Sequence, residues 1–218
     1  MIETSPIDKI VRSVLHHPRV EALGLTVIKG VLLNLNQLLR EQRIAGGWAA
    51  AAIVPVTSRD CFEIVQRVRD EMRSAYVQVI NPDRVLNKDH VILSLQNVVA
   101  AHQHGYNKMN RVDSELLLVM AGVNNFEMAV KALAPKDKGD VVLVAFSANK
   151  DEALESVRLF EKYADSRARE LAFSNSGPRL STLVEMYGIP KDSLAELSEE
   201  ELAKALAERG AIFYAKYR

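Results

Sequence analysis

Cysteine is nearly absent from this sequence, which contains a single thiol, Cys61, in 218 residues. One cysteine excludes an intrachain disulfide and a metal site built from several thiolates. The thiol falls on the apolar stripe of an expected helix, where cysteine usually serves as a small core residue. The five histidines never show the spacing of three or four residues that a zinc site on one helix requires. The sequence therefore predicts no metal site and no cofactor.

An excess of charge of one sign and long apolar runs are also missing. Lys and Arg together number 28, as do Asp and Glu, so any contact with a nucleic acid must come from a local basic patch. No apolar run approaches the roughly 20 residues of a membrane helix. The N-terminus lacks the basic segment and apolar core of a secretory signal. We therefore expect no membrane association, and a composition with 48% hydrophobic residues predicts a globular core.

The short motifs of common enzymes are missing as well. Gly46-Gly47 is followed by Trp48 and not by the Lys-Ser or Lys-Thr of a phosphate loop, and no Gly-x-Ser-x-Gly elbow occurs. One enzymatic alternative stays open, in which His102 or His104 forms an acid–base pair with Glu115. Such an enzyme would need a deep pocket beside the loop that follows these histidines, and a perturbed histidine pKa.

What is present is an alternation of strand and helix patterns. Short apolar runs predict strands at 49–56, 76–80, 115–121 and 141–147, and the run at 115–121 is expected to be central because it is almost entirely apolar. Between these runs, expected helices begin at Thr57, Asn87, Asn124 and Asn149. The alternation alone favours parallel strands, although we do not infer strand direction from it.

The chain therefore divides into two expected parts. Residues 1–47 carry two short helical patterns and end at Gly46-Gly47, which we expect to be a hinge. Residues 48–218 predict an α/β or α+β domain with a small mixed sheet of four or five strands, flanked by helices. The N-terminal part is thus a helical extension of the main domain.

Polar and basic residues gather at the two ends of the run 115–121. Lys108 and Arg111 lie in a loop before it, and Asn124 and Asn125 follow it. Lysine and arginine supply phosphate contacts, exposed amides can bind base edges or sugar hydroxyls, and Tyr106 could stack on a base. The residues alone favour the simpler interpretation of a solvated loop and a helix cap.

A final helix is predicted from the capping box of Ser198 and Glu201. Its apolar face contains Leu202 and Leu206, and Ile212 follows shortly after. Such a face either packs on its own domain or forms a surface for a partner. The sequence leaves these alternatives about equal.

The order and spacing of these motifs resemble the small accessory subunit of the KEOPS complex, the PRPK-binding, TPRKB-type family. The similarity runs from about Ala49 to Ile212. It comprises the turn Ile80-Asn81-Pro82, the loop Asn107-Lys108-Met109, an expected strand beginning Ser114-Glu115, the pair Asn124-Asn125 before a helix with a buried Ala129, and Arg209-Gly210 in the closing helix. The chain departs from the family at Val123 and at Leu133-Ala134-Pro135, and residues 1–47 have no evident counterpart.

Members of this family are non-catalytic, and the resemblance implies a function in tRNA modification. It implies binding to the small atypical kinase/ATPase subunit of KEOPS, indirect association with the other subunits, and support of threonylcarbamoyladenosine formation with the tRNA 3′ end held by the protein. The implied RNA contacts are Lys108, Arg111, Asn124 and Asn125, and the implied kinase contacts are Leu202, Leu206 and Ile212. We expect the protein in the cytoplasm, the nucleus or both.

Overall fold

The computed structural model describes residues 41–57, 60–136, 138–171, 177–188 and 198–216. All of them belong to one compact unit, Arg40–Arg218. The second unit, Met1–Leu39, lies outside the described residues, and so do the helices that the sequence predicts there.

Twelve elements make up the described part of the chain. In order they are β1 (Glu41–Ile44), β2 (Gly47–Val56), α4 (Cys61–Glu71), β3 (Tyr76–Ile80), the 3₁₀ helix η1 (Pro82–Arg84), α5 (Lys88–His104), α6 (Val112–Ala121), α7 (Phe126–Leu133), β4 (Gly139–Ser147), α8 (Lys150–Ala164), α9 (Gly177–Tyr187) and α10 (Glu199–Lys216). The predicted class, a small sheet flanked by helices, is confirmed.

The four strands form one sheet in the order β1-β2-β4-β3, and each neighbouring pair is antiparallel. The helix α4 connects β2 to β3. These two strands run in the same direction, because each of them is antiparallel to β4. They are not neighbours, however, because β4 lies between them and pairs with both. This split arrangement explains why the alternation of strands and helices resembles a parallel sheet in the sequence.

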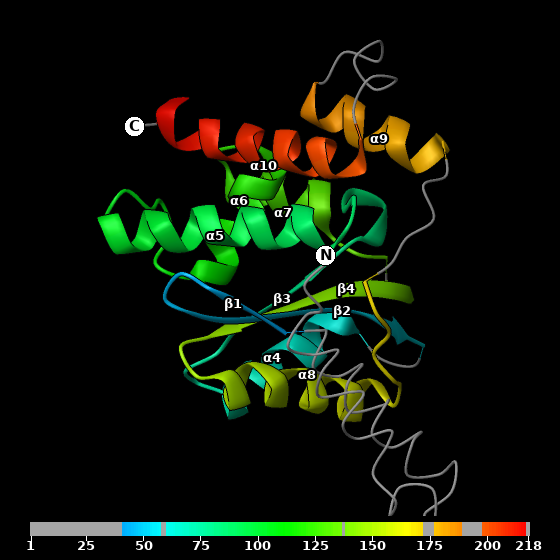
Figure 1. Cartoon of the computed structure of the whole chain (residues 1–218). Coiled ribbons are helices and arrows are strands. Elements are labelled where there is room, and N and C mark those ends of the chain that lie inside the picture. Colours follow the sequence, from blue (N-terminus) through cyan, green and yellow to red (C-terminus); the bar gives the residue numbers. More distant parts are fainter. Residues whose placement is uncertain (1–40, 58–59, 137, 172–176, 189–197, 217–218) are drawn as a thin grey trace, which may run out of the picture. The chain divides into compact units, whose positions relative to one another are not determined.

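Helices cover both faces of the sheet (Figure 1). Alternate residues of β2 point to opposite faces, so Ala49 and Ala51 pack with α5 and α6, while Ala50 and Ala52 pack with α4 and α8. Because both faces are buried, the strand has a continuous apolar sequence. The helix α10 packs on α5 and α6, where a Cβ atom added at Gly210 would lie 2.8 Å from Cγ1 of Val119. Glycine at this position allows α10 and α6 to approach closely.

The prediction of a central strand at 115–121 is wrong, because these residues form most of the helix α6. The helix begins after Arg111 and ends at Gly122, whose φ of 66° suits a glycine C-cap. Its side chains are buried all round, so the sequence shows an unbroken apolar run without helical periodicity. A short run of this kind does not distinguish a buried strand from a buried helix.

Three local predictions also need correction. In place of the expected hinge at Gly46-Gly47, Ala45 and Gly46 form a hairpin turn with Gly46 at a φ of 80°, and Gly47 begins β2. The helix α4 is capped by Asp60 and not by Thr57. The helix α7 is capped by Asn125 and not by Asn124, and its side-chain oxygen accepts a hydrogen bond from the amide of Met128. The predicted caps at Asn87 and Asn149 are confirmed.

Candidate functional site

The loop between α5 and α6 is held by the carboxylate of Glu115. This side chain is fully buried, and both of its oxygens accept the amide N–H of Lys108 at 3.0 Å. One of them also accepts the amide of Met109 at 2.5 Å. The side-chain amide of Asn107 donates to the carbonyl of Met109 and closes the turn. The loop therefore has a fixed backbone, and Glu115 has a structural function as its anchor.

The anchored loop presents Lys108 to solvent. The side chain is exposed, and within the described residues its ammonium group takes part in no ion pair. Just before it in the chain, the rings of His104 and Tyr106 stack nearly parallel, with centroids 6.2 Å apart. Tyr106 also makes an edge contact with Tyr214, with the ring centroids 5.2 Å apart. An exposed cation two residues after a stacked aromatic pair is an arrangement that can bind an unpaired nucleotide.

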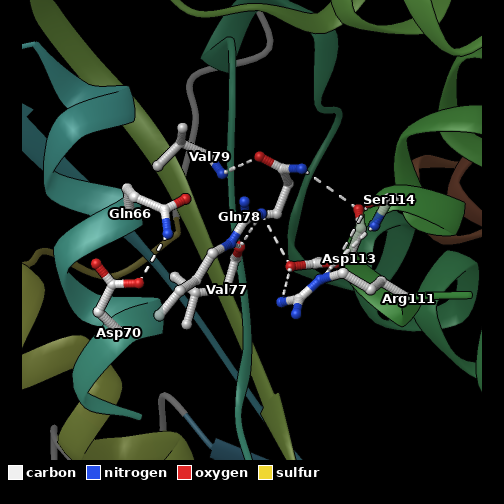
Figure 2. Close-up of polar contacts among 9 residues, drawn as sticks. Gln66, Asp70, Val77, Gln78, Val79, Arg111, Asp113 and Ser114 are labelled. Carbon is white, nitrogen blue, oxygen red and sulfur yellow. Dashed lines mark hydrogen bonds and ion pairs between the residues drawn. The ribbon is translucent and has the colours of Figure 1, made fainter. Parts of the chain in front are cut away.

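Arg111 has a structural partner in α6. Its Nε and Nη2 donate to the two oxygens of Asp113 at 3.0 and 2.9 Å (Figure 2). Arg69 from α4 reaches the same carboxylate at 2.9 Å. The Asp113 side chain is 2% exposed, against 25% for Arg69 and 47% for Arg111. Burial lowers the pKa of Arg69, whereas the hydrogen bonds to Asp113 raise the pKa of Arg111. Two cations thus share one carboxylate and leave the cluster with a net positive charge.

The structure does not bring the four predicted RNA contacts together. Lys108 and Arg111 precede α6, whereas Asn124 and Asn125 follow it. The ten residues of α6 lie between the two groups, which corresponds to a rise of about 15 Å. Asn125 is engaged as a helix cap, and Asn124 is exposed. The basic loop and the asparagine pair are therefore separate positions on the surface.

The three predicted kinase contacts also differ in exposure. Leu202 and Leu206 are 5% and 1% exposed, and they pack with Leu183 and Tyr187 of α9. Ile212 is 54% exposed. The first two residues thus support α10 from inside the domain, and Ile212 alone of the three can touch a partner in this conformation. The kinase interface itself stays a prediction.

The histidines of the described residues fall into two groups. His90 is buried: the amide of Leu86 donates to its Nδ1, and its Nε2 lies 3.0 Å from the hydroxyl of Tyr187, which donates to the carbonyl of Met120. The sequence shows no sign of this buried chain of hydrogen bonds, because His90 and Tyr187 are 97 residues apart. His102 and His104 lie at the C-terminal end of α5, and the carboxylate of Glu115 is already bound by the amides of the loop.

Metal ligands and membrane spans give no further candidate site in the described residues. These residues contain no group of three or more His, Cys, Asp or Glu side chains placed to hold a metal ion. No single helix among them is long and apolar enough to cross a membrane; only the pair α6 and α7, bent by 74°, meets that criterion by length and composition.

The fold defines a small α/β protein. Its two main surface features are the basic loop that Glu115 anchors and the partly exposed ion cluster of Arg69, Arg111 and Asp113. The model of the family "Kinase binding protein CGI-121" matches residues 58–210, which is well over half of the chain. The chain therefore belongs to this kinase-binding family. The family is the one to which the TPRKB-type resemblance points, so that prediction is confirmed. A search of curated proteins found no match.

Proposed function

We propose that this protein is a non-catalytic KEOPS-type accessory subunit that binds a small atypical kinase/ATPase and tRNA, and so supports threonylcarbamoyladenosine formation. The observation that carries the proposal is the match to a kinase-binding family over residues 58–210. The other KEOPS subunits associate with it indirectly, in the cytoplasm, the nucleus or both.

The anchored loop supports the RNA part of this proposal. Its backbone is fixed by Glu115, so the cation of Lys108 and the ring of Tyr106 are presented without a large cost of ordering on binding. Cations that bind phosphates beside rings that stack on bases are typical of proteins that bind single strands. The unpaired 3′ end of a tRNA has this chemistry.

The RNA experiment should change Lys108 and leave Arg111 intact. Reversal of charge at Arg111 would also place a carboxylate beside Asp113, so weaker binding would not separate RNA contact from misfolding. For Lys108→Glu we expect weaker tRNA binding and a flatter dependence on salt. The log–log slope should decrease by about 0.7 for each single-strand phosphate that the variant no longer binds. Equal affinities and slopes for Lys108→Glu and the wild type would reject the RNA assignment.

A matched control is available on the other side of the sheet. Lys162 of α8 is exposed, and α8 packs on the face opposite to that of the loop. The variant Lys162→Glu introduces the same change of net charge, and we expect it to retain the slope of the wild type. Weaker binding in both variants would indicate only a response to net charge.

The kinase part is tested at Ile212. We expect Ile212→Glu to reduce co-purification with the cognate kinase, because a charge in an apolar contact costs desolvation. Met128 of α7 is 59% exposed, so Met128→Glu is a control of similar exposure. Undiminished co-purification of Ile212→Glu would place the kinase interface elsewhere. Substitution of Leu206 is unsuitable for this purpose, because its burial makes it a test of folding.

A further inference from the structure

A groove runs beside β3, the strand at one edge of the sheet. The helix α4 forms one wall with Phe62 and Arg69, and α6 and α7 form the other wall with Ser114 and Phe126. The enclosed space is about 280 Å³ and lies beside Gln78 and Val79 of the strand. This volume is just below the range of about 300–1,000 Å³ that is typical of whole small-molecule ligands. It suits one or two anchoring side chains better than a cofactor.

The edge of β3 is covered by side chains of the same domain. The carbonyl of Val77 accepts hydrogen bonds from Nε and Nη2 of Arg69, at 3.1 and 2.7 Å. The amide of Val79 donates to Oε1 of Gln78 at 2.9 Å, and the other end of that side chain reaches the carbonyl of Asp113 (Figure 2). Edge strands present unpaired backbone groups to which other chains can add, and proteins often protect such groups with polar side chains. This cover consists of side chains, and the one that binds the amide of Val79 belongs to β3 itself.

The groove and its surroundings combine apolar and basic side chains. Four large hydrophobic side chains are exposed among the described residues, and two of them, Phe62 and Phe126, line this groove. Arg69 lines the groove as well, and it shares the carboxylate of Asp113 with Arg111, which lies outside the lining. Within the described part of the chain, neither guanidinium uses its Nη1 nitrogen in a hydrogen bond or an ion pair. The groove therefore offers an aromatic anchor point and, at a distance, spare donors with a net positive charge.

We propose that this groove docks an extended segment of a partner protein, which places an aromatic or aliphatic side chain between Phe62 and Phe126 and an aspartate or glutamate at Arg69 and Arg111. The segment lies along β3, in the manner of strand addition to a sheet edge. Charge complementarity selects the acidic residue, and the two exposed phenylalanines of the lining select the apolar one. The proposal does not depend on the kinase or on tRNA.

The walls favour a peptide over a nucleic acid. Most of the side chains that line the groove are apolar, among them Val65, Leu117 and Val130, and the polar ones are Gln66, Arg69, Gln78 and Ser114. A mainly apolar lining suits the side chains of a peptide better than base edges and sugars, whose recognition depends on many donors and acceptors. A backbone in extended conformation can lie along β3 and pair with the amide of Val79 once the side chain of Gln78 moves, while Arg69 stays on Val77 and Asp113.

The four exposed hydrophobic residues provide a matched experiment. A phage library of random linear peptides is selected on the purified full-length chain, and the enriched peptides are titrated against four variants. Phe62→Ala and Phe126→Ala remove the anchor point, whereas Met128→Ala and Ile212→Ala remove somewhat more exposed side chains outside the groove. All four changes are on the surface, so the fold is expected to persist.

We expect enriched peptides with an apolar residue and an acidic residue a few positions apart. Their affinity should fall about tenfold, or about 1.4 kcal/mol, in each groove variant and by less than about twofold in the two controls. Replacement of the peptide's acid by its amide should produce a similar loss without any change to the protein. The proposal is overturned if selection on the wild-type chain enriches no peptide relative to selection on the Phe62→Ala, Phe126→Ala double variant. It is likewise overturned if the enriched peptides are basic. It is also overturned if a polyuridine oligonucleotide, and no peptide, loses affinity in the groove variants.

Discussion

Replacement of Asp113 by asparagine tests whether the ion cluster holds α4, β3 and α6 together. The carboxylate is 2% exposed and receives two hydrogen bonds from Arg111 and one ion pair from Arg69. Asparagine keeps the shape and removes the charge, so two guanidinium groups would face each other without a counter-ion. Loss of one partner from a buried pair costs about 3–5 kcal/mol. Because the two arginines are 25% and 47% exposed and water screens them, we expect a lower value of about 2–3 kcal/mol.

The assay is urea unfolding of the full-length chain, in which the midpoint should fall while the slope m stays constant. Asp140 provides the control, because its pair with Arg169 is short, 2.6 Å, but the two side chains are 45% and 57% exposed. For Asp140→Asn we expect a loss of at most about 1 kcal/mol. Equal losses for the two variants would refute the reasoning. A double-mutant cycle of Asp113→Ala with Arg111→Ala should in addition show a coupling of about 0.5–3 kcal/mol.

Three further predictions concern the loop and α10. Glu115→Gln should weaken tRNA binding while kinase co-purification persists, because the amides of the basic loop lose part of their acceptor; binding titrations and co-purification check this. Gly210→Ala should destabilise the domain by about 1 kcal/mol, because the new Cβ atom would overlap Val119. The higher helix propensity of alanine does not offset this overlap, and urea unfolding measures the difference. Hydrogen bonds from Ser198 lower the pKa of Glu201, so they contribute stability that is complete above its ordinary pKa and is lost as the pH falls through the lowered value. Ser198→Ala should therefore reduce the acid dependence of the unfolding midpoint below about pH 4.3.

The sequence predicts those elements whose signal is local. The strands at 76–80 and 141–147 are confirmed, as is the cap at Asn87. Each of them depends on residues a few positions apart, such as an amide oxygen placed three residues before the N–H that it accepts. Features of this kind do not need the rest of the domain in order to be recognised.

The wrong predictions concern features that depend on tertiary packing. The helix α6 is covered on all sides, so it lacks the periodicity by which a helix is recognised, and the insertion of β4 between β2 and β3 is a matter of topology. Leu202 and Leu206 are typical both of a partner surface and of a core, and only the position of α9 shows that they are buried. In the same way, the sequence around Arg111 predicts a phosphate ligand, and only the structure shows that its guanidinium pairs with the buried Asp113.

The two candidate surfaces differ in the kind of signal that reveals them. The basic loop is continuous in sequence, so its composition and the family resemblance both point to it before any fold is known. The groove beside β3 is assembled from four elements, and Phe62 and Phe126 are 64 positions apart in the chain. No local pattern marks either phenylalanine as exposed, yet Phe62 is 44% and Phe126 is 40% exposed. Two large apolar side chains that are exposed and line the same groove are therefore informative, because stability alone does not account for their exposure.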